Sequence, residues 1–120
     1  MTITSAICNS FKQEILVGTH NFTASSGDTF KISLYSSDSA TLNKSTTAYT
    51  APADGTADPT NTYEVTSTSS GYTTGGNSLT STTPVLSGDT ACCKFADTSW
   101  GSSASFTARG CLIYNSTNSN

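Results

Sequence analysis

The sequence predicts a mainly β fold: an antiparallel sandwich or jelly-roll-like domain with one amphipathic helix near its N-terminus. Short runs of alternating apolar and polar residues recur along the chain, separated by turn residues such as Gly, Asp, Asn and Pro. The chain also contains 21 Ser and 23 Thr residues, and the β-branched Thr side chain suits a pleated, half-exposed strand. A length of 120 residues suits one domain, which we place at residues 1–120.

The first element is the one stretch with helical periodicity, "SAICNSFKQEILVGTH" at residues 5–20. Phe11 and Ile15 are four residues apart and therefore share a helix face, and Gly18 can end the helix. We expect a helix over about 5–17 that packs on the end or open face of a sheet. Docking of this helix on a partner subunit is the alternative.

The clearest strand follows at "FKISLY". Phe30, Ile32 and Leu34 alternate with polar residues, so they share one face of the strand. We expect this face to lie in the core.

Residues 36–62 form a long polar stretch in which Leu42 and Tyr49 are the large apolar residues. Pro and Gly residues interrupt it, so we expect a surface excursion with one short strand near residues 46–50. Such long loops inside a small domain are uncommon and are often functional. We expect this one to contact a neighbouring subunit; plain flexibility is the alternative.

The second half of the chain predicts further short strands at residues 63–66, around Leu79 and at 84–86. A Ser-Gly-Asp turn then leads to "TACCKF", in which Ala91, Cys93 and Phe95 alternate with Cys92 and Lys94. The predicted core residues are Phe11, Ile15, Phe30, Ile32, Leu34, Cys93, Phe95, Phe106 and Leu112.

An apolar strand, "CLIYN" at residues 111–115, lies close to the C-terminal end of the sequence. It is expected to be an edge strand, to pair with a neighbouring subunit, or to precede further strands. We therefore expect Ile113 and Tyr114, together with Leu42 and Tyr49, to contact a partner.

No catalytic, cofactor-binding or metal-binding residues can be nominated from the sequence. His20 is the single histidine, the eight acidic residues are spread out, and no C-x-x-C motif is present. The four cysteines suit small apolar core positions. Two alternatives to this core role are a disulfide and a metal site. The candidates for the disulfide are Cys8, Cys93 and Cys111. We expect no enzymatic activity.

Charge and hydropathy exclude other classes. The net charge is −3 and the five cationic residues are scattered, so we expect no nucleic-acid binding. No apolar run reaches 18 residues, so we expect no membrane span. The first ten residues contain no basic or long apolar region, so we expect no signal peptide and synthesis in a cytoplasm.

Several phrases in order, "SAICNSFKQEILVGTHNF", "GDTFKISLYSSDSATL", "TAYT", "GYTTGGNSLT", "FADTSW" and "TARGCLIYN", carry a resemblance over nearly the whole chain. The sequence resembles a family of small tailed-bacteriophage virion structural proteins. Members of that family have Ala at the position of Cys111, continue past "IYN" and lack the stretch "APADGTADPTNT". The family carries no activity that can be transferred to a residue here.

The resemblance implies a structural protein of a phage particle, made in the bacterial host cytoplasm and located in the virion. We expect a capsid decoration or cement protein that stabilises the shell through contacts with the major capsid protein and with its own copies. A tail, tail-tip or fibre component, whose aromatic residues bind a host sugar or protein, is the second hypothesis. A subunit of an extracellular bacterial filament or surface layer is the third.

Overall fold

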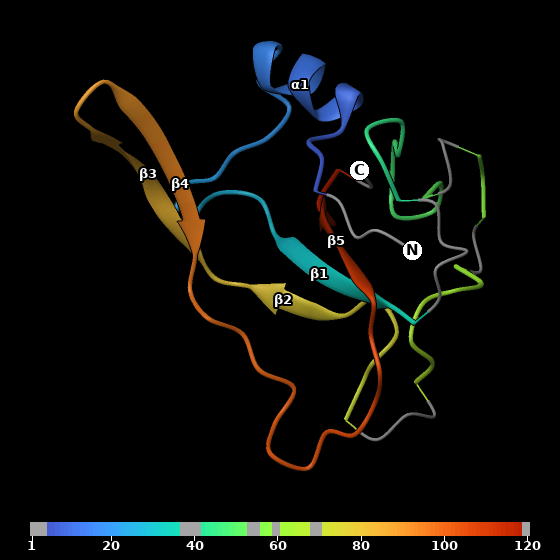
Figure 1. Ribbon diagram of the computed structural model, residues 1–120. Helices are drawn as coiled ribbons and strands as arrows, with labels where there is room; N and C mark the ends of the chain where they lie inside the picture. The colour runs from blue at the N-terminus through green and yellow to red at the C-terminus, as the bar shows by residue number, and fades with distance from the viewer. Residues whose placement is uncertain (1–4, 37–41, 53–55, 59–60, 68–70, 119–120) are drawn as a thin grey trace.

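The computed structural model describes residues 5–36, 42–52, 56–58, 61–67 and 71–118 (Figure 1). Within these residues the chain is mainly β, with two antiparallel sheets and one short helix near the N-terminus, which confirms the predicted fold class. The elements in chain order are α1 (Asn9–Leu16), β1 (Phe30–Tyr35), β2 (Asn77–Leu79), β3 (Ser81–Ser87), β4 (Thr90–Phe95) and β5 (Gly110–Asn115).

The larger sheet has three strands in the order β2-β1-β5, and both pairings are antiparallel. The predicted strand "FKISLY" is thus its central strand, where Phe30 lies between Leu79 of β2 and Asn115 of β5. The β1–β5 pairing joins an early and a late segment of the chain, and the Ser116 N–H extends it by donating to the Thr29 carbonyl at 2.9 Å.

One face of this sheet, which we call the apolar face, carries aliphatic and thiol side chains. Ile32 lies opposite Ile113 and Leu34 lies opposite Cys111, so these four side chains share it with Phe30. Phe30 is buried, with 2% of its surface exposed, whereas Ile32 and Leu34 are only half-buried. The face predicted to be core is therefore closed at the Phe30 end alone.

The opposite face, the tyrosine face, is the more deeply buried one. Ser33 is 0% exposed and Tyr35 is 1% exposed. The Tyr35 hydroxyl donates to Asn61 Oδ1 at 3.0 Å, and the Tyr114 hydroxyl donates to the Gly75 carbonyl at 2.9 Å. These bonds show that the segments 61–67 and 71–76 cover this face. Their polar groups also accept the hydrogen bonds of the tyrosine hydroxyls there.

Aromatic rings close the Phe30 end and join the sheets. The Phe22 ring stacks on Phe30 with 4.4 Å between centroids, and Phe95 of β4 lies 5.5 Å from Phe30. On the helix side, Phe11 stacks on His20 at 4.9 Å. This aromatic base gives the domain a sandwich-like contact between β1 and β4.

The smaller sheet is a two-stranded hairpin, β3–β4, which we call the hairpin. Its register places Leu86 opposite Ala91 and Val85 opposite Cys92, with a turn at Gly88 and Asp89. Gly88 has a φ of +61°, as a tight hairpin turn requires. Beyond its base the hairpin projects away from the rest of the domain (Figure 1).

The helix is shorter than predicted and begins later. It spans Asn9–Leu16 rather than about 5–17, because Cys8 is extended and the Asn9 N–H donates to the Lys44 carbonyl at 2.8 Å. That bond holds the preceding residues against another segment and so prevents a helical turn there. Gly18 follows the helix with a φ of +76°, in line with its predicted role as the terminating residue.

The core assignment is wrong for two residues, Ile15 and Cys93. Ile15 is 43% exposed because the helix contacts the domain mainly through Phe11 and Glu14, and no residue of the helix is buried. Cys93 is exposed because β4 leaves the domain body with the hairpin. The remaining predicted core residues besides Phe30 are half-buried: Phe11, Ile32, Leu34, Phe95, Phe106 and Leu112.

Two predicted strands are reduced to single bridges. Near residues 46–50 the structure has a turn with one bridge between Ala48 and Ala51, and at 63–66 it has one bridge between Glu64 and Tyr35. Side-chain bonding outweighs strand propensity at both places, because Thr46 and Glu64 bond to loop segments instead of lengthening a ladder. Residues 37–41, 53–55 and 59–60 of the predicted excursion lie outside the described residues.

Candidate interaction surface

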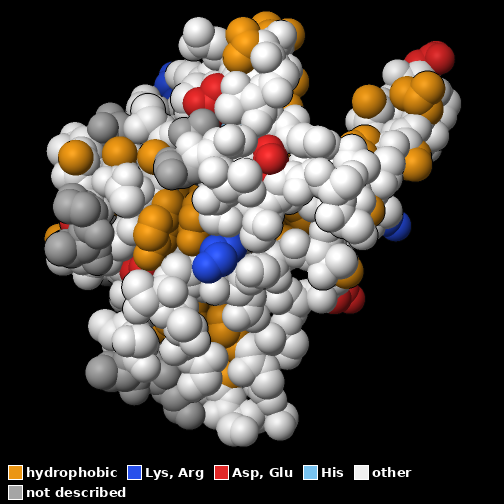
Figure 2. Space-filling view, turned by 180° about the vertical axis from the view of Figure 1, so that it is seen from behind, with side chains coloured by type: hydrophobic (Ala, Val, Ile, Leu, Met, Phe, Trp, Pro, Cys, Tyr) orange, Lys and Arg blue, Asp and Glu red, His pale blue; other side chains and the backbone are white. Residues whose placement is uncertain are grey.

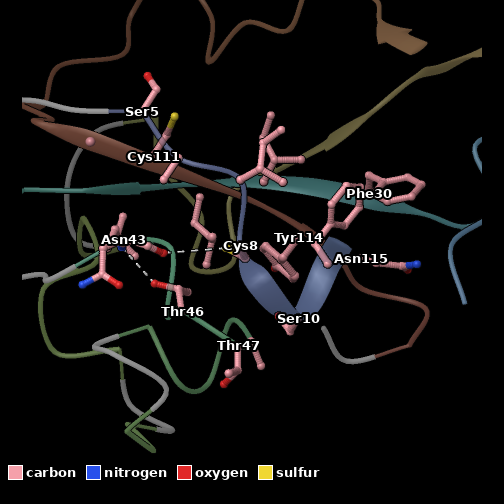
Figure 3. Close-up of a pocket in the computed structure, with 18 of the residues that line it drawn as sticks. Ser5, Cys8, Ser10, Phe30, Asn43, Thr46, Thr47, Cys111, Tyr114 and Asn115 are labelled. Atoms are coloured by element: carbon pink, nitrogen blue, oxygen red, sulfur yellow. Dashed lines mark hydrogen bonds between the residues drawn. The ribbon is translucent and has the colours of Figure 1, made fainter. Parts of the chain in front are cut away.

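The described chain forms an apolar groove of about 840 Å³. Its floor is the open part of the apolar face, from Phe30 and Leu34 to Cys111 and Ile113. One wall is the N-terminal segment 5–11, as Figure 3 shows around Cys8 and Cys111. The other walls are formed by residues 42–48 and by the base of β4.

Backbone and hydroxyl bonds hold the groove walls in place. The Cys8 thiol donates to the Asn43 carbonyl at 3.8 Å, and the Asn43 N–H donates to Thr46 Oγ1 at 3.1 Å (Figure 3). Thr46 is 2% exposed, and its hydroxyl donates to the Pro52 carbonyl at 2.6 Å. The groove is therefore formed by the fold itself and does not need a ligand to shape it.

The edge of the larger sheet beside the groove is β5. Among the described residues, no strand pairs with its outer edge, and Ile113 on this strand is 50% exposed. An apolar edge strand of this kind can pair with a strand of another chain.

The hairpin is the second exposed apolar feature. Val85 is 61% exposed and Leu86 is 75% exposed. Figure 2 shows the hairpin projecting from the domain, with apolar side chains along it. Asp89 lies in the turn between β3 and β4. Isolated two-stranded hairpins are at best marginally stable in water, so this one depends on its base or on a further surface.

The tyrosine face is closed around one buried carboxylate. Glu64 is 5% exposed, and its Oε1 accepts from the Tyr72 hydroxyl and from the Gly75 N–H, both at 2.7 Å. Its Oε2 accepts from the Tyr49 hydroxyl at 2.5 Å. Tyr49 in turn stacks on Tyr114 with 4.6 Å between centroids. We call this set the Glu64 cluster; it fastens three loops over the sheet.

Burial raises the pKa of four tyrosines: Tyr35 on the tyrosine face, and Tyr49, Tyr72 and Tyr114 in the Glu64 cluster. Desolvation raises the pKa of Tyr35 to about 12 and that of Tyr114 to about 12. Desolvation, together with the bond to the Glu64 carboxylate, also raises the pKa of Tyr49 and of Tyr72. These tyrosines are neutral hydrogen-bonding groups of the interior. They are thus not arranged as an exposed platform for a sugar.

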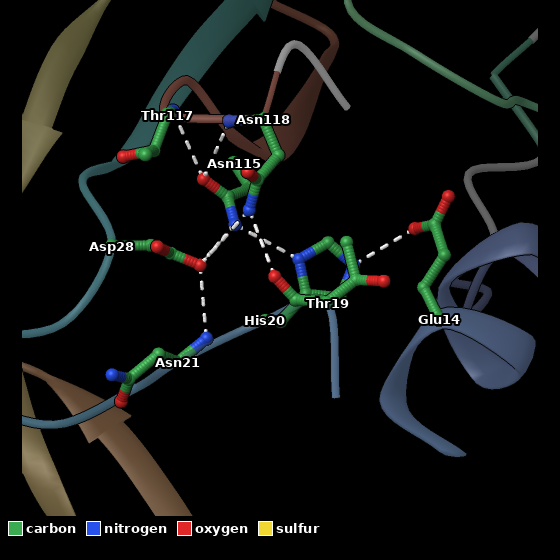
Figure 4. Close-up of polar contacts among 8 residues, drawn as sticks. All are labelled: Glu14, Thr19, His20, Asn21, Asp28, Asn115, Thr117 and Asn118. Atoms are coloured by element: carbon green, nitrogen blue, oxygen red, sulfur yellow. Dashed lines mark hydrogen bonds and ion pairs between the residues drawn. The ribbon is translucent and has the colours of Figure 1, made fainter. Parts of the chain in front are cut away.

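His20 is part of a second polar network, which fixes the helix to the C-terminal strand (Figure 4). Its Nε2 donates to Glu14 Oε2 at 2.8 Å, and its Nδ1 accepts from Asn115 Nδ2 at 2.9 Å. Asn115 Nδ2 also donates to Asp28 Oδ2 at 2.7 Å. With a side chain that is 2% exposed and both nitrogens engaged, His20 has a positioning role.

The cysteines are free thiols in this structure. Cys92, Cys93 and Cys111 are exposed, and Cys8 is half-buried, so the prediction that the cysteines are buried core residues is wrong for three of them. Within the described residues, no three His, Cys, Asp or Glu side chains lie close enough together to hold a metal ion. No helix in the same part of the chain has the length and apolarity to cross a membrane.

The four predicted partner-contact residues divide into two pairs. Leu42 and Ile113 line the groove and remain partly exposed, so they are available to a partner. Tyr49 stacks on Tyr114 within the Glu64 cluster. Tyr114 also lines the groove, but it is 9% exposed and its hydroxyl donates to the Gly75 carbonyl, so little of its surface is left for a partner.

The hairpin was not predicted to be a contact surface from the sequence. A signal was present, because residues 84–86 and 91–93 are apolar without alternation. That pattern is typical of a strand with both faces covered. In the isolated chain both faces are exposed instead.

Comparison with known proteins identifies no relative of the chain. No family model, no curated protein and no solved structure matches the chain.

Proposed function

We propose that the chain is a non-enzymatic structural subunit of a bacteriophage particle, of the capsid decoration or cement type. The observation that carries the proposal is the pairing of a preformed apolar groove with an exposed apolar hairpin on a small, weakly charged domain. The sequence resemblance to small virion proteins supports the same assignment.

The proposed mechanism is the burial of apolar surface between subunits. Each Å² of apolar surface removed from water contributes about 25 cal/mol, and a standard interface buries about 1,600 Å² in total. Repeating such contacts over a shell multiplies the effect and opposes the outward pressure of packaged DNA. The partners in this proposal are the major capsid protein and further copies of this chain, and the location is the virion after synthesis in the host cytoplasm.

The surface of the chain suits such a role. The Ser- and Thr-rich exterior is hydrated without strong charge, so neighbouring copies are not driven apart by repulsion.

Quantitative mass spectrometry of purified particles tests the proposal. A copy number equal to that of the major shell protein, or a simple fraction of it, is expected for a decoration protein. A handful of copies per particle would contradict decoration and support a tail component. Complete absence from particles would overturn the virion assignment altogether.

A second test uses particles that lack the chain. Adding the purified protein back is expected to raise the melting temperature of the shells, measured by scanning calorimetry. Bovine serum albumin at the same mass concentration is the control. Binding without any rise in melting temperature would contradict the cementing role.

Within the part of the chain that the structure describes, no strand pairs with the outer edge of β5, and this edge favours a second function, a subunit of an extracellular filament or surface layer. Such a subunit polymerises by strand pairing without any particle present. Filaments of the purified protein in electron micrographs would support this alternative, and a protein that stays dispersed would contradict it.

A further inference from the structure

The chain exposes more surface than a compact monomer of its size. Its accessible surface is 7354 Å², whereas a compact monomer of 12.4 kDa exposes roughly 6,100 Å². Its radius of gyration is 14.7 Å, against roughly 13.6 Å for a compact domain of 120 residues. The excess of roughly 1,200 Å² exceeds the 800 Å² or so that each partner buries in a standard interface.

The hairpin is attached to the rest of the domain at its base. The Ala24 N–H donates to Thr83 Oγ1 at 3.0 Å, and the Phe95 ring lies 5.5 Å from Phe30. Every residue between Thr82 and Lys94 is exposed. The outer part of the hairpin therefore presents two uncovered faces to solvent.

One of those faces continues into the groove. Side chains at alternate positions of β4 share a face, so Ala91, Cys93 and Phe95 point to the same side, and Leu86 joins them opposite Ala91. Cys93 and Phe95 line the groove. A single apolar strip, Leu86–Ala91–Cys93–Phe95, thus runs from the groove to the hairpin turn.

A strip that is continuous with a groove is suited to a second copy of the same chain. Under a two-fold axis, the hairpin of each copy enters the groove of the other, and the same contacts form twice. The groove and the hairpin strip of both copies are then covered in the same dimer. No groove is left open to bind a third copy.

Charge at the two ends of this contact is complementary. Asp89 lies at the hairpin turn, and Arg109 lies on the groove wall. Within the described residues neither side chain forms an ion pair, and both are exposed. A hairpin that extends along the groove of another copy can bring its Asp89 to that copy's Arg109.

We propose that two copies of this chain form a dimer in which each copy inserts its hairpin into the groove of the other, so that the strip of each copy lies in the other copy's groove. This inference deepens the proposed function, because it names the surface through which copies contact each other. It concerns the purified chain alone, and it can therefore fail or stand independently of any particle.

Sedimentation equilibrium of the full chain under reducing conditions measures the association directly. A dimer is expected for the wild type. Leu86→Asp is expected to weaken dimerisation roughly 30-fold or more, because it places a charge in the apolar strip that lies in the groove of the other copy. Leu16→Asp is the matched control, since Leu16 is 87% exposed on the helix and outside the groove; it is expected to leave dimerisation unchanged.

Thiol cross-linking tests the face of the hairpin independently. On mild oxidation with diamide, which accepts the two hydrogens released by two thiols, the Cys93 thiol is expected to bond to Cys8 or Cys111 of the other copy. Cys93→Ser is expected to abolish the cross-linked dimer on a non-reducing gel. Cys92→Ser is the control, since Cys92 lies on the opposite face of the hairpin, and it is expected to retain the band.

Three outcomes would overturn the inference: a wild-type monomer at all concentrations, equal dimerisation of the Leu86→Asp variant, or cross-linking that depends on Cys92 instead of Cys93. Circular dichroism of each variant confirms that it is folded. A monomer that is abundant in particles would overturn the exchange and leave the proposed function standing. A dimer that is absent from particles would do the reverse.

Discussion

Removal of the Glu64 carboxylate is expected to unfasten the loops that cover the tyrosine face. The carboxylate is 5% exposed and accepts three hydrogen bonds, from the hydroxyls of Tyr49 and Tyr72 and from the Gly75 N–H. Substitution Glu64→Ala leaves these three donors, of which Tyr72 and Gly75 are buried and Tyr49 is half-buried, without their acceptor, whereas Glu64→Gln preserves most of the geometry.

The expected magnitudes follow from the bonds that each variant loses. A buried donor left unsatisfied costs about 1–3 kcal/mol, so Glu64→Ala is expected to lower the free energy of unfolding by about 3 kcal/mol or more. In Glu64→Gln the amide oxygen can accept from Tyr72 and Gly75 while the amide nitrogen donates to the Tyr49 oxygen. That variant loses the charge assistance, about 1–2 kcal/mol, and the Tyr49 O–H, which donated to Glu64 Oε2, loses this acceptor.

Urea unfolding followed by the fluorescence of Trp100 measures these differences. Trp100 stacks on Tyr72 with 6.4 Å between ring centroids, so its emission reports on the loop that Glu64 holds. Asp97→Ala is the control: Asp97 is exposed, and its removal is expected to change the free energy of unfolding by less than about 0.5 kcal/mol.

A double-mutant cycle with Tyr49→Phe isolates the shortest bond of the cluster. Once Glu64 is Ala, removal of the Tyr49 hydroxyl is expected to restore about 1 kcal/mol, because one orphaned donor disappears. If Glu64→Ala destabilises the protein no more than Asp97→Ala does, the carboxylate does not organise this face. If Glu64→Ala fails to fold, the Gln variant provides the measurement.

Three further predictions concern the core, the sheet and the buried tyrosines. Phe30→Ala is expected to lower the free energy of unfolding by about 3–5 kcal/mol in a urea titration. Leu16→Ala, at an exposed position, is expected to lower it by less than about 0.5 kcal/mol, and equal effects of the two variants would refute the assigned core. Gly76→Ala is expected to prevent folding as judged by circular dichroism, because Gly76 has a φ of +74° and a Cβ there would clash with the Ile32 carbonyl group. A folded variant would contradict this close approach. Stability is expected to fall as the pH rises from about 10 to about 12, because tyrosine ionises near pH 10 in the unfolded chain while Tyr35 and Tyr114 keep their protons until about pH 12. The loss is about 2–3 kcal/mol per residue and is measured by urea titration at each pH, and a flat profile over this range would refute it.

Local features could be predicted from the sequence. The period-two alternation of "FKISLY" predicted β1, the turn residues before "TACCKF" predicted the hairpin, and Gly18 predicted the end of the helix. These features depend on backbone preferences of adjacent residues, and such preferences are written in the sequence itself.

The candidate interaction surface was predictable only in part. Leu42 and Ile113 were expected to be available to a partner, and they line the groove. Cys93 was assigned to the core because alternation identifies two faces of a strand without saying which one meets another element. The exposure of the hairpin depends on where β4 leaves the domain, and no local pattern encodes that direction.

The mainly β content, the positions of β1 and the hairpin, and the low charge could all be predicted from the order of the residues. Which face of the larger sheet is buried depends on how distant segments meet. Segments 61–67 and 71–76 return to cover the tyrosine face, and Glu64 reaches hydroxyls from distant loops. Burial is a property of segments that meet in space, so an isolated run of alternating residues cannot specify it.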